Sequence, residues 1–266
     1  ITIAITKARK VLLRVDAKKL RKVEASIKGR HMKLDKNNFV FRCKELKPSF
    51  YLPCYKTDYI QQLILSEQSY YENVNLNYVC RDWEKGKVGN DIANNCILDI
   101  GANIGNHTLY FFFECGINKA YCFEPMQPTF DILTQNMKLN GLSDQVNLKN
   151  VAVGTENGMA SVVHFDETNL GATQITIKEG GAIPVISIDS LNIEDDIKLI
   201  KIDVEGFEVD VIKGCLQTID KNRPYIMMEI QENNLTIIES LLSQFNYQSI
   251  HLGKLNYLFF NHAKDN

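Results

Sequence analysis

Residues 97–107, Ile-Leu-Asp-Ile-Gly-Ala-Asn-Ile-Gly-Asn-His, constrain the fold of this chain more than any other stretch. A short apolar strand carries Asp99, a turn follows on Gly101 and Gly105, and an amphipathic helix comes next. Glycine accepts a positive φ and lets the backbone pass close beneath a ligand. The turn also directs the free amides of a helix N-terminus toward the crevice beyond the strand, where open α/β sheets bind ligands. The stretch therefore predicts an α/β fold that binds a nucleotide-like cofactor.

Short apolar strands alternate with helical patterns from about residue 96 onward, which is typical of βαβ units on a parallel sheet. The chain then closes with two β-rich runs around Gly253, which predict an antiparallel hairpin that a dinucleotide-binding sheet does not usually have. The predicted strands are 97–100, 120–123, 146–151, 199–203 and 225–229, the predicted helices 104–115, 128–140, 207–219 and 234–245, and the hairpin runs 248–252 and 257–261.

We divide the chain into an N-terminal extension, residues 1–95, and a cofactor-binding domain, residues 96–266. An excursion at 153–189 interrupts the alternation, and we expect it to contribute to a binding site. The extension holds a basic amphipathic helix around 17–27, a small hairpin within 39–50 and a helix over 58–72 that we expect to act as a lid over the crevice.

The composition excludes few classes of protein. A net charge of −2 over 266 residues provides no overall attraction to nucleic acid. The basic segment 7–36 leaves a weak contact with a membrane surface open. No apolar run is long enough to span a bilayer, and the seven scattered cysteines suit reduced structural thiols, so we expect a cytoplasmic protein. The chain opens with Ile1 rather than Met, which leaves open whether residues precede it.

Four carboxylates stand at or near the ends of four predicted strands: Asp99, Glu124, Asp203 and Glu229. The carboxyl ends of parallel strands meet at one rim, so these groups repel one another unless they meet cations, ligand hydroxyls or a metal. Glu124, about twenty residues after the glycine turn, is placed to bind vicinal ribose hydroxyls. The GxxxG spacing of the turn differs from the GxGxxG of dehydrogenases, and it suits a cofactor without a pyrophosphate.

Five segments in order resemble the FkbM family of S-adenosylmethionine-dependent O-methyltransferases. The resemblance covers about residues 95–230, and Tyr71-Glu72 and Tyr51–Pro53 also resemble segments upstream of that domain. It implies a class I methyltransferase (Rossmann-like) α/β fold, with an antiparallel seventh strand beside the fifth, that methylates sugar hydroxyls of glycans, surface polysaccharides or glycosylated metabolites. The segments are 97–107, 123–125, 185–190, 201–208 and 223–229.

The resemblance assigns roles to individual residues. Asp99, Gly101 and Asn103, on the turn that Gly105 completes, would contact the methionine end of the cofactor. Glu124 would hold the ribose, and Val151-Ala152 would lie against the adenine. Asp203 would stand near the reacting methyl group.

Methylation of an alkyl hydroxyl needs a base that takes its proton. Asp203 is the first candidate, and Glu205, Glu229 and His107 are its rivals. A less favoured alternative is that Asp203, Glu205 and Glu229 hold Mg²⁺ or Ca²⁺, because hard cations prefer carboxylate oxygens.

Other readings remain open at this stage. The acceptor is expected to be a sugar or glycan, with a lipid, polyketide or RNA ribose hydroxyl as alternatives, although nucleic acid is not favoured. A module that binds the cofactor without catalysis and a dehydrogenase are alternatives of other classes. The sequence does not decide whether the chain forms homo-oligomers.

Overall fold

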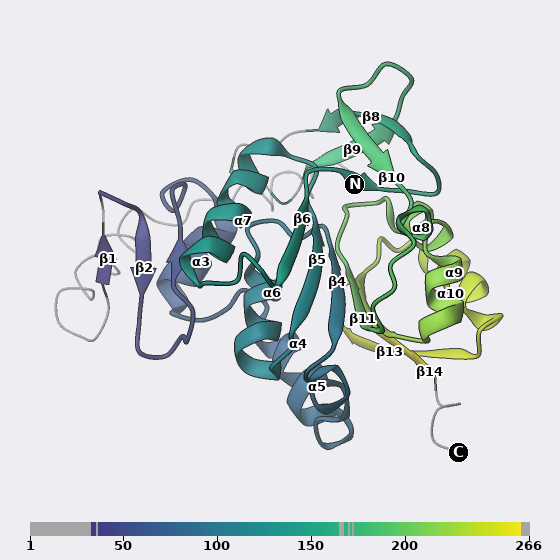
Figure 1. The fold of residues 1–266 in the computed structure, drawn as a ribbon, viewed down its shortest axis with the longest axis horizontal. Helices are drawn as coiled ribbons and strands as arrows, with labels where there is room; N and C mark the ends of the chain where they lie inside the picture. The colour runs from purple at the N-terminus through teal and green to yellow at the C-terminus, as the bar shows by residue number, and fades with distance from the viewer. Residues whose placement is uncertain (1–32, 36, 165–167, 170, 172, 262–266) are drawn as a thin grey trace, which may run out of the picture.

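The computed structural model describes residues 33–35, 37–164, 168, 169, 171 and 173–261, and its centre is a seven-stranded sheet (Figure 1). Six strands run parallel, and β14 runs antiparallel between β12 and β13. This arrangement confirms the terminal hairpin and the position of its last strand. The order across the sheet is β13 (Tyr247–Gly253), β14 (Asn256–Asn261), β12 (Tyr225–Glu229), β11 (Ile197–Ile202), β4 (Cys96–Ile100), β5 (Lys119–Phe123) and β6 (Val146–Lys149).

Both faces of the sheet are covered, because its central strands carry apolar side chains on both sides. Ile97 and Leu199 enter one apolar cluster, while Leu98 and Ile200 enter another. In Figure 1 helices α8 (Glu208–Lys213), α9 (Leu216–Asn222) and α10 (Leu235–Ser243) cover the second face. The first face is covered by α5 (Lys87–Ile92), α6 (Asn106–Tyr110), α7 (Gln127–Leu139) and the N-terminal part of the chain.

Two predicted helices are interrupted. The helix expected over 104–115 consists of α6 and a π-helical stretch, η3 (Phe111–Cys115). The helix expected over 207–219 breaks into α8 and α9 at Gly214, which packs against the carbonyl of Gly154; a methyl group there would lie 2.0 Å from that oxygen. Close packing therefore requires the glycine, and glycine favours the break.

The N-terminal part differs in detail from its prediction. Instead of one hairpin, residues 33–51 form three short strands, β1 (Lys33–Asp35), β2 (Val40–Arg42) and β3 (Phe50–Tyr51). The helix expected over 58–72 is α3 (Tyr59–Glu67), which ends where Gln68 turns left-handed. The basic helix around 17–27 lies outside the described residues. Short helical turns lead on to α5: α4 (Asn73–Asn77), η1 (Tyr78–Asp82) and η2 (Trp83–Lys85).

The excursion forms its own sheet, in the order β7-β10-β8-β9. The strand predicted over 146–151 ends at Lys149, because the side chain of Asn150 donates to the carbonyls of Glu124 and Pro125 and the chain then pairs with β10. These strands stand above the large sheet in Figure 1: β7 (Ala152–Val153), β8 (Gly158–His164), β9 (Gln174–Ile177) and β10 (Ile183–Ile186), followed by the turn η5 (Asp189–Leu191).

Among the described residues, no helix has both the length and the apolar character that crossing a bilayer requires.

The contact at Gly214 makes a prediction about stability. We expect Gly214→Ala to lower the free energy of unfolding by about 3 kcal/mol, since the added methyl group overpacks a backbone contact. The matched control is Gly116→Ala, which has a positive φ of 71° but open space around it, and it should lose only about 1 kcal/mol. Urea unfolding measures both, and equal losses would contradict this account of the helix break.

Candidate functional site

The four carboxylates identified in the sequence meet at the carboxyl ends of four adjacent strands. Asp99 lies in β4, Glu124 follows β5, Asp203 follows β11 and Glu229 ends β12. Asp99 raises the pKa of both Glu124 and Asp203, and Asp203 raises the pKa of Glu229. The structure therefore brings the predicted rim together.

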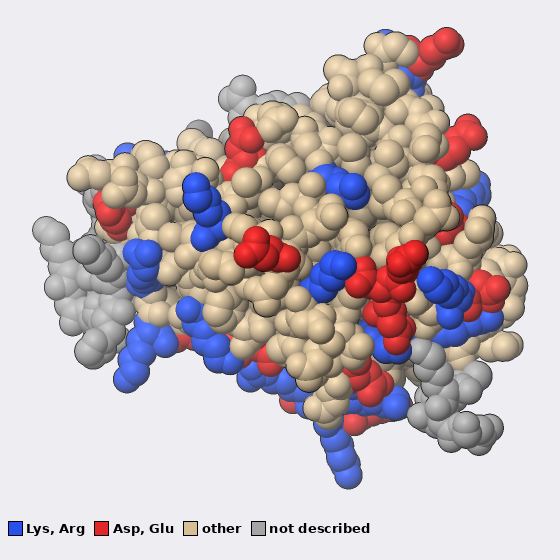
Figure 2. Space-filling model, in the orientation of Figure 1, with Lys and Arg blue, Asp and Glu red and all other residues tan. Residues whose placement is uncertain are grey.

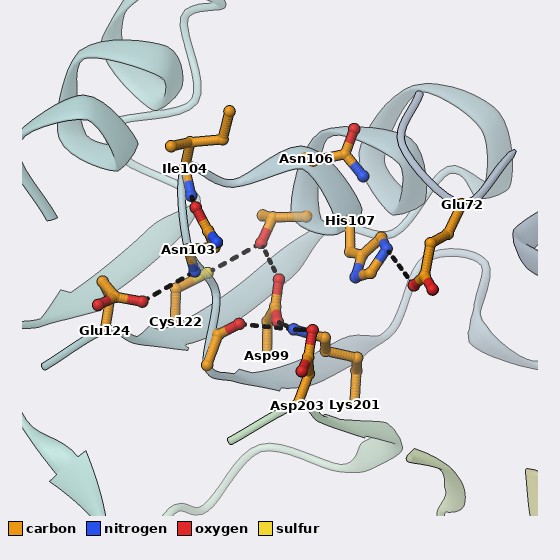
Figure 3. Close-up of polar contacts among 12 residues, drawn as sticks. Glu72, Asp99, Asn103, Ile104, Asn106, His107, Cys122, Glu124, Lys201 and Asp203 are labelled. Atoms are coloured by element: carbon orange, nitrogen blue, oxygen red, sulfur yellow. Dashed lines mark hydrogen bonds and ion pairs between the residues drawn. The ribbon is translucent and has the colours of Figure 1, made fainter. Parts of the chain in front are cut away.

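Lys201 is the cation that these carboxylates require, and the sequence analysis gave it no role. It lies opposite Asp99 in the register of β11 and β4, and both side chains are buried. Its Nζ is 3.1 Å from Asp99 Oδ1 and donates to the carbonyl of Gly101 at 2.6 Å (Figure 3). Burial would lower the pKa of this lysine, but Asp99, Asp203 and Glu72 outweigh burial and raise it, so the ammonium stays charged.

Asp99 lies beneath the glycine turn, and its oxygens face the interior of the protein. Its second oxygen accepts from the hydroxyl of Thr108 on α6 at 2.6 Å (Figure 3). The ion pair with Lys201 and this bond tie β4, β11 and α6 together directly under the turn. Direct contact of Asp99 with a cofactor stays a prediction; the structure shows it as a support of the turn.

The turn needs its glycines for packing as well as for their φ. A methyl group on Gly101, at φ 74°, would lie 1.8 Å from the carbonyl of Asp203. At Gly105, with φ 86°, it would lie 2.5 Å from Met137 on α7. Gly101 thus lets the ends of β4 and β11 approach, and Gly105 lets α7 pack behind the turn.

The amides of the turn that precedes α6 are already bonded within the protein. Those of Gly101 and Ala102 donate to the carbonyl of Phe123, and that of Ile104 donates to the side chain of Asn103. The amide of Asn103 itself donates to Glu124 Oε2 at 3.0 Å. The turn, residues 101–105, is tightly coiled, so its amides lie within hydrogen-bonding distance of these acceptors. The turn therefore offers shape more than unused donors.

Glu124 is buried at the floor of the site, and both of its oxygens hold backbone amides. Oε1 accepts from Met126 at 2.9 Å and Oε2 from Asn103 at 3.0 Å. Burial raises the pKa of Glu124 to about 7, although the two amides and Lys201 lower it. Each carboxylate oxygen keeps a further lone pair, so a fixed Glu124 can still accept from two adjacent hydroxyls.

A cleft of about 600 Å³ opens above this rim, and we call it the main cleft. Asp99 and Gly105 lie outside its lining. The predicted site residues that line it are Gly101, Asn103, Glu124, Val151, Ala152, Asp203 and Glu205.

The main cleft is also lined by residues that had no individual role predicted from the sequence. The excursion supplies Gly171, Thr173 and Ile175, which supports the expectation that this segment contributes to a site. Phe207, just before α8, and Met126 complete apolar walls. Phe207 could have been found from the sequence, because it lies in the segment 201–208.

A second cavity of about 190 Å³, which we call the side pocket, adjoins the same rim. Asp203 lines both cavities, and His107 and Glu229 line only the side pocket. Glu205, at φ 50°, lines only the main cleft. The side pocket also contains Glu72, which the sequence analysis quoted in a family segment without giving it a role.

The acidic groups of the side pocket differ in their protonation. Burial and then Asp203, Glu72 and Glu205 raise the pKa of Glu229 to about 8, against the effect of Lys201. Burial also raises the pKa of Asp203, although Lys201 lies 3.9 Å from its carboxylate. Glu72 is the exception: burial alone would raise its pKa, but His107, Lys201 and Asn256 together lower it.

The residues that the structure describes contain no group of three or more histidine, cysteine or acidic side chains placed to hold a metal ion. A cation held by Asp203, Glu205 and Glu229 is the less favoured alternative from the sequence, and these residues are not part of such a group.

Comparison with known proteins gives consistent matches. The profile of the methyltransferase FkbM domain matches residues 99–249. A crystal structure of methyltransferase FkbM from Methylobacillus flagellatus KT is similar with a TM-score of 0.50 and 20% identity, over 76% of this chain and 52% of that one. That likeness supports the class I methyltransferase fold.

Two curated relatives are similar at low identity. Methyltransferase sdnD of Sordaria araneosa is 24% identical over 163 residues, 48% of this chain and 62% of that protein. The hexuronic acid methyltransferase AglP of Haloferax volcanii is 25% identical over 146 residues, 52% of this chain and 56% of that protein. The matched regions thus span about three fifths of these relatives.

The buried ion pair predicts a large stability effect. Lys201→Met should lower the free energy of unfolding by about 3–5 kcal/mol, because it leaves Asp99 buried without its cation. The double variant Asp99→Leu/Lys201→Met should recover a large part of that loss. Urea unfolding at neutral pH measures both variants; a single variant as stable as the wild type would show that the pair does not support the rim.

Glu124 makes the stability depend on pH. Its pKa is raised from 4.5 to about 7 on folding, so between these values the folded chain binds more protons than the unfolded chain. This contribution to the free energy of unfolding is therefore lost as the pH rises through that window. Glu124→Gln should flatten the decline between pH 5 and about 7, whereas the exposed control Glu156→Gln should keep the wild-type slope. Identical slopes in all three proteins would refute the assignment.

Proposed function

Because the chain belongs to the family of FkbM methyltransferases, we propose that it is an S-adenosylmethionine-dependent O-methyltransferase that acts on a sugar hydroxyl. The observation that carries this proposal is the position of Asp203, which lines both the main cleft and the side pocket. A group-transfer enzyme needs two sites that meet at the reacting atoms.

The residues of the main cleft fit S-adenosylmethionine. Glu124 is held in place by two amides and has acceptor capacity left for a ribose diol. The apolar side chains of Met126, Val151 and Phe207 can cover the faces of an adenine. We assign the end of the cleft at Gly101, Asn103 and Asp203 to the methionine part.

Bound S-adenosylmethionine supplies a methyl group that is electrophilic because the neighbouring sulfur carries a positive charge. The protein aligns the acceptor oxygen with this group and excludes water. Four candidate bases line the two cavities. Asp203 lines both, Glu205 lines the main cleft, and Glu229 and His107 line the side pocket.

A sugar acceptor is supported by the hexuronic acid methyltransferase among the relatives, at 25% identity. Nucleic acid is less suited to this surface. Figure 2 shows lysines and arginines interspersed with acidic side chains over the visible face. Several lysines of the chain form ion pairs with acidic side chains, as Lys119 does with Asp195. RNA-binding faces instead concentrate positive charge. All seven cysteines are unpaired, which supports the proposal of a cytoplasmic location.

Isothermal calorimetry tests the cofactor. We expect S-adenosylmethionine and S-adenosylhomocysteine to bind the wild type with micromolar affinity, and NAD not to bind. Glu124→Ala should weaken both by about tenfold or more, because the ribose loses a charge-assisted acceptor. The exposed control Glu156→Ala should bind as the wild type does. Binding of NAD without binding of S-adenosylmethionine would overturn the proposal.

Mass spectrometry of a panel of glycans, nucleotide sugars and lipids tests the acceptor. The addition of one methyl group to a sugar, dependent on S-adenosylmethionine, is the expected result. Cofactor binding without transfer to any compound would favour a module that binds the cofactor without catalysis, and transfer to a lipid alone would refute the sugar.

A further inference from the structure

The side pocket contains a carboxylate–imidazole pair, of which the proposed function names only His107, as one of four candidate bases. The Nε2 atom of His107 lies 3.5 Å from Glu72 Oε2, and both side chains are largely buried (Figure 3). His107 is 6% exposed and projects from α6, directly after the glycine turn. A histidine that faces a carboxylate through one nitrogen can take a proton with the other.

Contacts from two elements, α6 and β14, hold Glu72 in this position. The side chain of Asn106, next to His107 on α6, accepts from the amide of Tyr71 and donates to its carbonyl, both at 3.0 Å. The side chain of Asn256 on β14 donates to Glu72 Oε1 at 3.4 Å. Glu72 itself has a φ of 56°, a value that L residues rarely adopt. Residues with such strained backbone angles cluster at functional sites. The pair is therefore built by residues far apart in the sequence.

The other ionisable groups that face His107 from neighbouring elements are Glu72, Glu229 and Asp203, with the ammonium of Lys201 nearby. Glu72 is ionised, since His107, Lys201 and Asn256 lower its pKa against the effect of burial. Glu229, whose pKa is raised to about 8, keeps its proton at neutral pH and can donate a hydrogen bond. Asp203 is engaged with the ammonium of Lys201.

We propose that the side pocket receives the reacting hydroxyl of a neutral polyol, and that His107, oriented by Glu72, accepts its proton. This inference rests on the proposed methyltransferase function. A neutral acceptor follows from the lining: the ionised Glu72 lies in the pocket with Asp203 and the protonated Glu229, and the ammonium of Lys201 is already paired with Asp99. A carboxylate or phosphate at the reacting end would meet these acids.

The atoms and charges of the step balance. The acceptor oxygen gives its proton to the ring nitrogen of His107 that does not face Glu72, and it forms a bond to the methyl carbon. The carbon–sulfur bond breaks, and its electron pair stays on sulfur, which becomes neutral. The imidazolium that results is stabilised by the Glu72 carboxylate and later releases its proton to water. Glu72 is thus a positioning residue and His107 the catalytic base.

Nitrogen-15 NMR of the His107 ring in the full chain tests the pair without any turnover. The wild type without added ligand should show the tautomer protonated on Nε2, because Glu72 accepts that hydrogen. Glu72→Gln should shift the ring toward a mixture of tautomers, whereas the exposed control Glu67→Gln should not. The inference would be overturned if the wild-type ring were protonated on Nδ1, or if Glu72→Gln left the tautomer of the ring unchanged.

Kinetics test the role of each residue. His107→Gln should lower kcat by about 10²–10⁴-fold while the affinity for S-adenosylhomocysteine stays unchanged. Glu72→Gln should lower kcat less and should leave KM nearly unchanged. Retention of kcat within threefold by His107→Gln would assign the base elsewhere and refute the inference.

Matched acceptors test the charge of the ligand. Neutral methyl glycosides should be methylated, and the corresponding uronic acid glycosides should react at least tenfold more slowly in kcat/KM. Equal or faster reaction of the uronic acids would refute the neutral acceptor. Failure of the wild type to bind S-adenosylmethionine would instead refute the proposed function. The tautomer of the His107 ring would still test whether Glu72 orients His107.

Discussion

The buried ion pair between Asp99 and Lys201 is the interaction on which the rest of the site depends. It joins the two central strands of the sheet in register, and it lies directly under the glycine turn. The same ammonium binds the carbonyl of Gly101, helps to lower the pKa of Glu72, and opposes the rise that burial causes in the pKa of Glu124 and Glu229. Without this cation, the buried carboxylate of Asp99 would have no opposite charge beside it, which is costly.

The ion pair also explains how one sheet edge can hold two different environments. On the side of β5, Glu124 lies under a wide cleft with apolar walls. On the side of β12 and β14, acidic and neutral polar groups line a narrower pocket. Asp203 stands between them, next to Lys201. Cofactor recognition and acceptor chemistry are thus separated by one residue, which is what group transfer between two ligands requires.

Sequence periodicity was enough to predict the parallel strands, the terminal hairpin and the convergence of four carboxylates, because these follow from local patterns and from the rule that parallel strands end at one edge. It was not enough to assign Lys201, since a lysine in a strand is ordinarily read as exposed. Glu72 was beyond reach for another reason: it meets His107 only when the N-terminal part of the chain packs on α6. The helix break at Gly214 likewise depends on a contact with the distant Gly154.

The central claim is that Asp203 separates a cofactor cleft from an acceptor pocket, and a crystal structure of the chain with S-adenosylhomocysteine tests it most directly. The account predicts the ribose hydroxyls on Glu124, the adenine against Val151 and Ala152, and the sulfur at the Asp203 end with the side pocket still open beyond it. A nucleoside bound in the side pocket, or one that leaves Glu124 without a ligand contact, would contradict the account.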